Sequence, residues 1–347
     1  LSLLRTDRLG LHLLRGGLGV ATVVTCGLFA AISGSSVATA ATIGIVALPA
    51  LTERGYNKSF SGAMIAAGGG LGILIPPSIA MIVFAVITEQ SIGSLFIAGV
   101  VPGLLLVAAF ALYVALFGPA IVEETRPSMS ERLAATRNAA GALGLPVLVL
   151  GAIYSGLATA TEVGAFGVAY VFLLGVATRT LDLRSVYEAT LVAARTTAMI
   201  FMLVGCGRLL TDFFTLSELP QNATNFVANL GLSPFLLVTV IVVILLILGM
   251  FLESLSMMLV VVPILYPMMM SLGFDPLAFG IFMVIAVEAA LITPPIGLNL
   301  FMLCSIGNIS IVSMSRQAVI YVGFMVILMY LVLFIPEIAT WLPASMK

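Results

Sequence analysis

The sequence has little charge and little of the chemistry that charged side chains supply. Its 347 residues include 14 Lys and Arg, 15 Asp and Glu, one His and one Trp, so that only 8% are charged. Soluble domains carry about 25% charged residues, whereas 61% of this chain is hydrophobic and its mean hydropathy is +1.24. A net charge of −1 without a basic stripe excludes nucleic acid as a partner. The chain is predicted to be a polytopic membrane protein in contact with lipid.

The scarcity of some residue types and the absence of some motifs also exclude several enzyme classes. Cys26, Cys206 and Cys304 stand singly in apolar stretches, without the CxxC spacing of a metal site. The single histidine, His12, lies in a charged N-terminal segment, so a Ser/His hydrolase would lack its base. The sequence has no GxxxxGK[ST] motif, which excludes a built-in ATP-driven motor. We therefore expect a protein that is not an enzyme and that has no organic cofactor.

Apolar stretches of about 20 residues can span a bilayer, and the chain has many of them. They cover residues 95–117, 140–157, 162–178, 189–210, 234–251, 254–272, 277–304 and 317–336. Most basic residues lie in segments that can all be placed on one side, which the positive-inside rule makes the cytoplasm. Arg15 and Arg54 then both lie in the cytoplasm, so the apolar stretch between them cannot be a single crossing.

A re-entrant hairpin over 16–51, turning at the run SGSS (Ser33 to Ser36), resolves this difficulty. The stretch 233–272 has flanks without Lys or Arg, which we interpret as periplasmic. It is predicted to be a second hairpin that turns at FLES (Phe251 to Ser254).

The second hairpin region repeats the first. At a shift of 218 positions the matched residues are Pro49 with Pro267, Gly55-Tyr56-Asn57 with Gly273-Phe274-Asp275, Pro76-Pro77 with Pro294-Pro295, and Ser35 with Glu253. Because the first unit starts from the cytoplasm and the second from the periplasm, the repeats are predicted to be inverted. Inverted repeats with discontinuous helices are typical of secondary transporters, whose sites lie at the membrane midplane.

Each unit contains a helix that is interrupted by adjacent prolines, in GGGLGILIPPS (Gly68 to Ser78) and in ALITPPIGLN (Ala290 to Asn299). Proline removes a backbone donor, and glycine permits conformations that free carbonyl groups. Such a break survives in a membrane only where it lines a cavity or is buried in protein. Since free carbonyls and hydroxyls are ligands for small hard cations, the breaks are predicted to be ion sites.

These patterns predict an all-α polytopic protein made of inverted repeats, each with a re-entrant helical hairpin and a broken transmembrane helix. The predicted parts are a first unit at 1–94 with hairpin 16–51 and broken helix 60–87, connecting or scaffold helices at 95–232, a second unit at 233–313 with hairpin 233–272 and broken helix 277–304, and a C-terminal helix at 314–347.

The two predicted turns offer different ligands. Ser33, Ser35, Ser36 and Thr39 supply hydroxyls at the first turn, and Gly34 would permit its tight geometry; serine is also a favoured N-cap, and the two roles are compatible. At the second turn Glu253 precedes Ser254 and could cap the returning helix, which is worth about 0.3–1 kcal/mol. A charge at the bilayer centre costs about 2.5–3.5 kcal/mol, so a functional role for Glu253 is favoured.

Oxygen-bearing residues also gather around the second break. Thr293, Gly297 and Asn299 offer a hydroxyl, a backbone and an amide oxygen. Glu288 lies five residues before Thr293, where it could either pair with a neighbour or brace the unwound segment. Glu162 follows a predicted helix start and is favoured as a first-turn acid.

These motifs resemble the large membrane subunit of the tripartite ATP-independent periplasmic (TRAP) transporters, the dicarboxylate-transporter M-subunit family. The resemblance runs from about Leu14 to Pro343, and its motifs include LRGGLGVATVVTCGLFAAISGSSVATA, ERGYNKSFSGAMIAAGGGLGILIPPS, GMFLES and EAALITPPIGLNLF. Members of that family have further transmembrane helices before the position that matches Leu1, so the chain is expected to be short at its N-terminus.

The resemblance implies an elevator-type ion transporter fold in the bacterial inner membrane. It implies sodium-coupled uptake of an organic acid, such as a C4-dicarboxylate or sialic acid, handed over by a periplasmic binding protein, with a small membrane (Q) subunit as partner. The implied sodium ligands are Ser33, Gly34, Ser35 and Ser36 with backbone from Gly72 to Pro76 at the first site, and Glu253, Ser254, Thr293, Pro294 and Gly297 at the second. The implied substrate ligands are Thr39, Ser78 and Asn299, with Glu288 in support.

Two other hypotheses fit the same residues. The first is an antiporter or a proton-coupled carrier of the same architecture, in which Glu253 or Glu288 titrates. The second is an assembly subunit with no transport activity of its own.

Overall fold

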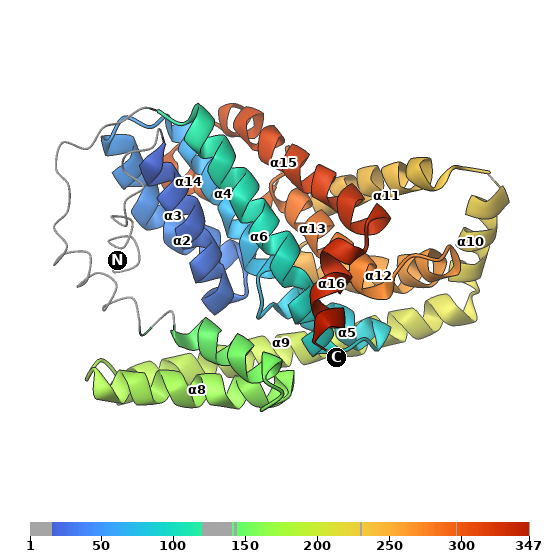
Figure 1. The fold of residues 1–347 in the computed structure, drawn as a ribbon, viewed down its shortest axis with the longest axis horizontal. Helices are drawn as coiled ribbons and strands as arrows, with labels where there is room; N and C mark the ends of the chain where they lie inside the picture. Colours follow the sequence, from blue (N-terminus) through green and yellow to red (C-terminus); the bar gives the residue numbers. More distant parts are fainter. Residues whose placement is uncertain (1–15, 120–140, 142–143, 230, 296, 347) are drawn as a thin grey trace.

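The computed structural model describes residues 16–119, 141, 144–229, 231–295 and 297–346, and every regular element within these ranges is a helix (Figure 1). Among the described residues five helices are long and apolar enough to cross a membrane. A sixth span results if α4 (Lys58–Leu74) and α5 (Ile79–Thr88), which are bent by 43° relative to each other, count as one. The prediction of an all-α polytopic protein is confirmed.

The first hairpin consists of α2 (Gly17–Ser33) and α3 (Ser36–Glu53), which are joined at Gly34 and Ser35. Gly34 has a φ of 61° and donates its N–H to the carbonyl of Ala30, which ends α2 in the left-handed conformation that glycine adopts without a Cβ penalty. Ser35 then caps α3 by accepting from the N–H of Ala38 at 3.4 Å. The turn needs only two residues because Gly34 and Ser35 themselves provide hydrogen-bond partners for backbone groups at both helix ends.

The first broken helix follows directly. α4 ends at Leu74, and α5 begins at Ile79 with Ser78 as its N-cap. Between them lie Pro76 and Pro77, which have no N–H to continue the α4 hydrogen-bond ladder. The carbonyls of Gly72 and Ile73 would bond to the amides four residues ahead, which are these two prolines, and therefore have no intrahelical donor.

The second unit repeats these elements in α11 (Pro234–Gly249), α12 (Ser254–Ser271), α13 (Pro276–Leu291) and α14 (Leu298–Gly307). Both bounds of α12 lie 218 residues after those of α3. The caps are repeated as well, because Asn57 accepts two backbone N–H groups at the start of α4 and Asp275 accepts two at the start of α13. The repeat found in the sequence is therefore present in the backbone, and in the hydrogen bonds that start α4 and α13.

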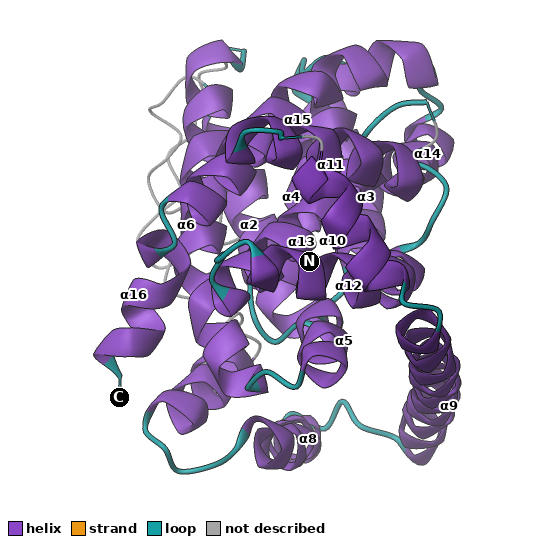
Figure 2. Ribbon diagram, turned by 90° about the vertical axis from the view of Figure 1, so that its right-hand side faces the viewer, coloured by secondary structure: helices purple, strands orange, loops and turns teal. Residues whose placement is uncertain are grey.

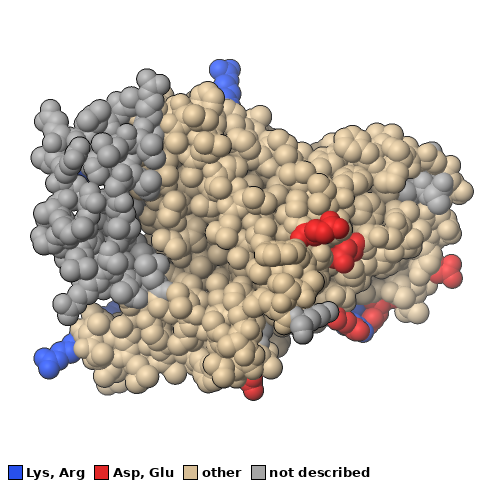
Figure 3. All heavy atoms as spheres, in the orientation of Figure 1, with Lys and Arg blue, Asp and Glu red and all other residues tan. Residues whose placement is uncertain are grey.

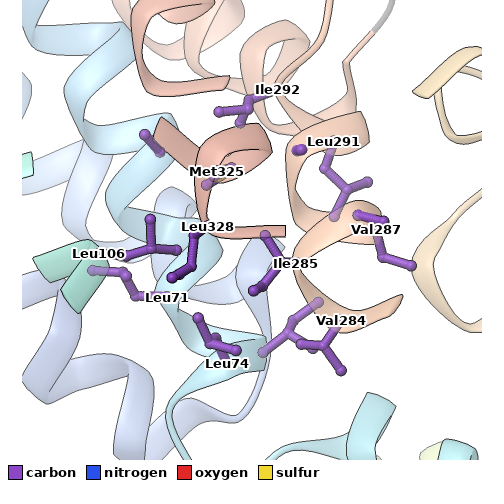
Figure 4. Packing of buried hydrophobic residues seen from close by; sticks show 14 of the residues in the cluster. Leu71, Leu74, Leu106, Val284, Ile285, Val287, Leu291, Ile292, Met325 and Leu328 are labelled. Atoms are coloured by element: carbon purple, nitrogen blue, oxygen red, sulfur yellow. The ribbon is translucent and has the colours of Figure 1, made fainter. Parts of the chain in front are cut away.

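The centre of the molecule is formed by α4 and α13, with α6 (Ile92–Phe117) and α15 (Ile311–Phe334) packed against them. Every residue of α4 from Phe60 to Leu74 and of α13 from Ala278 to Leu291 is buried. Figure 4 shows apolar side chains of these four helices pointing toward one another, among them Leu71, Leu106, Ile285 and Leu328. The two helices that carry the breaks are thus enclosed by protein, as a broken helix in a membrane requires.

The connecting helices lie at the edge. In Figures 1 and 2, α8 (Ala160–Ala177) and α9 (Leu183–Leu216) run along one side of the molecule, followed by α10 (Leu219–Asn229). With 34 residues α9 is about 51 Å long, more than the hydrocarbon thickness of about 30 Å, so it must tilt or extend beyond it. Many apolar side chains of α8 and α9 are exposed.

The chain continues through helix Gly144–Tyr154 before α8 and closes with α16 (Glu337–Ser345), which packs against α6. On the face drawn in Figure 3 the charged side chains are few and scattered over an uncharged surface. Such a surface is suited to lipid rather than to water.

Candidate functional site

The first hairpin turn lies directly against the first broken helix. A Cβ added to Gly72 would come within 2.8 Å of the Ser35 carbonyl oxygen and 3.0 Å of the Thr39 hydroxyl. A Cβ on Gly34 would come within 2.8 Å of the Pro77 carbonyl oxygen. The two glycines therefore let the turn and the break touch through their backbones, with the Pro77 carbonyl against Gly34 and the Ser35 carbonyl against Gly72.

The predicted hydroxyls of the first site have different partners. Thr39 is buried and donates to the Ser35 carbonyl at 2.8 Å, while Ser33 is half-buried and donates weakly to the same carbonyl at 3.4 Å. Ser78 is buried and caps α5 by accepting from the N–H of Met81. The structure thus gathers Ser33, Ser35 and Thr39 around one backbone carbonyl, with Ser36 one residue further along the same turn.

Ser36 connects the first turn to the other repeat. Its hydroxyl donates to Oε2 of Glu288 at 3.0 Å and accepts from Nδ2 of Asn299 at 2.6 Å. All three side chains are buried. Of the two roles that we considered for Glu288, the structure gives it a partner, and that partner comes from the other half of the chain.

The second turn has other surroundings. Glu253 is exposed and caps α12 by accepting from the N–H of Leu255 at 3.1 Å, and the Ser254 hydroxyl donates to its Oε1 at 3.0 Å. The capping role that we set against a functional role is therefore present. The functional role of Glu253 as a cation ligand stays a prediction.

The structure brings the candidates at the second break less closely together. Thr293 donates to the carbonyl of Ala289, one turn back in its own helix. Gly297 has a φ of +36° and precedes α14, while Pro294 is half-buried. Among the described residues no hydrogen bond joins Glu253 or Ser254 to these three, and Ile296 lies outside the described residues.

Sequence reasoning missed the part played by Gly70. This glycine of α4 lies against Oε2 of Glu288, where a side chain would overlap the carboxylate. The shift of 218 positions that defines the repeat places Gly70 on Glu288, so the two residues occupy equivalent positions and touch each other. That register was visible in the sequence and could have pointed to a contact between the repeats.

Other features belong elsewhere. An apolar cavity of about 570 Å³ lies between α8, α9 and the residues that flank the first site, including Ile32 and Pro77; its apolar lining does not suit an organic anion. Glu162 forms a capping box with Thr159, which confirms its role as a first-turn acid. No group of three His, Cys, Asp or Glu side chains that could hold a metal ion occurs in the described ranges.

Comparison with known proteins places these features in a family. The family model described as the DctM component of tripartite ATP-independent periplasmic transporters matches residues 9–338. The "C4-dicarboxylate TRAP transporter large permease protein DctM" of Pseudomonas aeruginosa is 38% identical over 333 residues, which are 95% of this chain and 78% of that protein. The "Isethionate TRAP transporter permease protein DctMQ" of Oleidesulfovibrio alaskensis is 36% identical, over 94% of this chain and 52% of that protein.

A solved structure shares the fold. The chain superposes on the YdaH transporter of Alcanivorax borkumensis with a TM-score of 0.62 and 15% sequence identity, over 96% of this chain and 84% of that chain.

Proposed function

Because the chain belongs to the DctM component family of the tripartite ATP-independent periplasmic transporters, we propose that it takes up an organic acid in symport with sodium. The observation that carries this proposal is the contact between the first hairpin turn and the first broken helix. There, the Ser35 carbonyl and the Thr39 hydroxyl lie against Gly72, and the prolines that follow leave the carbonyls of Gly72 and Ile73 without intrahelical donors. Neutral oxygens of this kind are suited to a small hard cation.

Two sodium sites follow from the repeat. The first uses Ser33, Ser35 and Ser36 at the turn defined by Gly34, with backbone oxygens from Gly72 to Pro76. The second uses Glu253 and Ser254 with Thr293, Pro294 and Gly297. Each sodium ion that enters down a membrane potential of 100 mV releases about 2.3 kcal/mol, so two ions could concentrate a monoanion considerably.

The substrate would lie between the two sites. The helices that begin beside the breaks, α3, α5 and α14, point their N-termini into this region, and helix N-termini favour anions. Thr39 and Ser78 are the candidate hydroxyls for its carboxylate. Asn299, which we also predicted as a substrate ligand, is already bonded to Ser36.

The substrate class is an organic acid, with C4-dicarboxylates favoured because the P. aeruginosa relative is named for them. The family implies a periplasmic binding protein that delivers the acid and a small membrane subunit beside this chain in the inner membrane. The name DctMQ of the isethionate relative, of which this chain covers 52%, fits the fusion of such a subunit to the large one. The exposed apolar side chains of α8 and α9 offer a surface for it.

The test is uptake of radiolabelled succinate into proteoliposomes that contain this chain, the small subunit and the binding protein. A sodium gradient should drive uptake, whereas a potassium gradient of equal ionic strength should not. Ser35→Ala should raise the sodium concentration for half-maximal uptake at least tenfold. Ser91→Ala, which removes the N-cap serine of α6 outside the site, is the matched control and should leave it unchanged.

A second mechanism has its own observation, the buried carboxyl group of Glu288. A proton-coupled carrier of the same architecture would take up succinate down an inward pH gradient without sodium. Uptake of this kind, unaffected by Ser35→Ala, would replace sodium symport as the function.

A further inference from the structure

The cluster of Glu288, Ser36 and Asn299 contains two buried oxygen atoms that lack a partner. Glu288 is 1% exposed and Asn299 is 0% exposed. Within the part of the chain that the structure describes, Oε1 of Glu288 and Oδ1 of Asn299 have no hydrogen-bond partner. Buried acceptors are paired in most native structures, and each orphan calls for an explanation, such as an ion that the site holds.

The direction of the hydrogen bonds shows what is missing. A serine hydroxyl has one hydrogen, and Ser36 gives it to Oε2 of Glu288 at 3.0 Å. The bond from Asn299 to Ser36, at 2.6 Å, must then use an amide N–H of Asn299. This arrangement fixes Oδ1 of Asn299 as a free acceptor, so the cluster has spare oxygens and lacks a positively charged partner.

Among the described side chains, none forms an ion pair with Glu288 that would supply this positive charge. The partner of Glu288 is a neutral hydroxyl, and Glu288 takes part in neither the Arg184–Glu188 nor the Arg208–Asp212 ion pair. Gly70 lies against the same oxygen, Oε2, and has no side chain that could carry a charge. A carboxylate withdrawn from water is costly unless a charge compensates it.

We propose that Glu288 Oε1, Asn299 Oδ1 and the free lone pair of the Ser36 hydroxyl bind a monovalent cation, with sodium as the ion under the proposed function. One carboxylate compensates one positive charge, whereas a calcium site takes six to eight oxygens and usually several carboxylates. The inference rests on the proposed sodium coupling for the identity of the ion. It assigns Glu288 and Asn299 to the cation, beyond the serine and backbone ligands described above.

The position of this site gives it a role in coupling. Ser36 begins the returning helix of the first hairpin, Glu288 precedes the second break, and Asn299 follows it in α14. The contact of Glu288 with Gly70 joins equivalent positions of the two repeats. A cation here holds the first turn and both sides of the second break in one arrangement, so its binding sets the geometry in which substrate is accepted.

The experiment is sodium binding to the purified full chain, measured by isothermal titration with sodium chloride and by thermal unfolding in sodium chloride against potassium chloride. Glu288→Gln keeps the shape of the side chain and removes its charge, and Asn299→Ala removes only the free amide oxygen and its donor. We expect each to weaken sodium binding more than tenfold and to reduce the sodium-specific rise in melting temperature. Ser61→Ala, which removes a buried hydroxyl without a partner, is the control and should bind sodium as the parent does.

Unchanged sodium affinity in folded Glu288→Gln and Asn299→Ala proteins would overturn the inference. So would a parent protein that melts identically in both salts, because the site would then hold a proton or nothing. If Glu288→Gln does not fold, Asn299→Ala decides the question alone. The proposed function fails separately: sodium-independent uptake by a chain whose sodium binding needs Glu288 would refute symport and leave this site standing.

Discussion

The serines that begin the returning helices of the two hairpins, Ser36 and Ser254, occupy equivalent positions, and each donates to a glutamate carboxylate at 3.0 Å. At the first turn the glutamate is Glu288, which comes from the other repeat and is buried. At the second it is Glu253, the preceding residue, which is exposed. The same hydrogen bond is therefore a contact between repeats in one unit and a local cap in the other.

The comparison shows how two repeated hairpins come to have turns with different contacts. The register of 218 residues places Ser35 on Glu253 and Gly70 on Glu288, so both glutamates belong to the second unit, and the first unit has a serine and a glycine at the equivalent positions. In the first unit the backbone carries the turn and the break into contact through Gly34 and Gly72. The second turn is capped by its own Glu253, which is exposed.

The largest expected effect on stability is at the first turn, where Gly34 lies against the break. Gly34→Ala places a Cβ at positive φ, which costs about 1–2 kcal/mol, and drives it against the Pro77 carbonyl, for which overpacking adds about 1–3 kcal/mol. Gly273→Ala also lies at positive φ but has open space around its Cβ. Unfolding in detergent should show a loss of about 2–5 kcal/mol for the first and about 1–2 kcal/mol for the second. Equal losses would mean that the turn is not closed on the break.

Removing the paired serines tests the comparison most directly. Ser36→Ala leaves a buried acceptor on Glu288 and a buried donor on Asn299, and each such group costs about 1–3 kcal/mol. Ser254→Ala frees only an exposed carboxylate, and exposed polar contacts contribute about 0.5 kcal/mol or less. The free energy of unfolding should fall by about 2–6 kcal/mol in the first variant and hardly at all in the second. A reversed order would contradict the assignment of the buried contact to the first turn.

The sequence predicts most of the fold because its strongest signals are local. Pro76-Pro77 and Pro294-Pro295 interrupt helices whatever the tertiary contacts around them. The turn at Gly34 depends only on the positive φ that this glycine adopts. The bond of Ser36 to Glu288 joins residues 252 positions apart, and no local rule assigns such a partner. The exposure of Glu253 likewise depends on tertiary packing, which the sequence does not give, and its functional role stays a prediction.

A smaller effect should be equal in the two units. Asn57 and Asp275 cap α4 and α13 through the same pair of backbone N–H groups, at 2.9 and 3.1 Å for Asn57 and at 2.9 Å twice for Asp275. Substitution of an N-cap by alanine costs about 0.5–2 kcal/mol, and asparagine and aspartate cap about equally well. Asn57→Ala and Asp275→Ala should therefore lower the free energy of unfolding by similar amounts. A large difference would show that the asymmetry extends beyond the turns into the start of the broken helices.

The smallest expected effect on stability is at the second turn. Glu253→Gln keeps an oxygen that can accept from the N–H of Leu255 and removes only the charge near the N-terminus of α12. That charge is worth about 0.3–1 kcal/mol and is screened by salt, so unfolding in potassium chloride should change little and less at high salt. The same variant measured in sodium chloride then isolates the ion. If sodium stabilises the parent and Glu253→Gln equally, Glu253 caps the helix and binds no sodium. The coupling ions then bind at the first turn. If the variant loses part of that stabilisation, the second turn holds a sodium ion of its own, and the exposed carboxylate of Glu253 is one of its ligands.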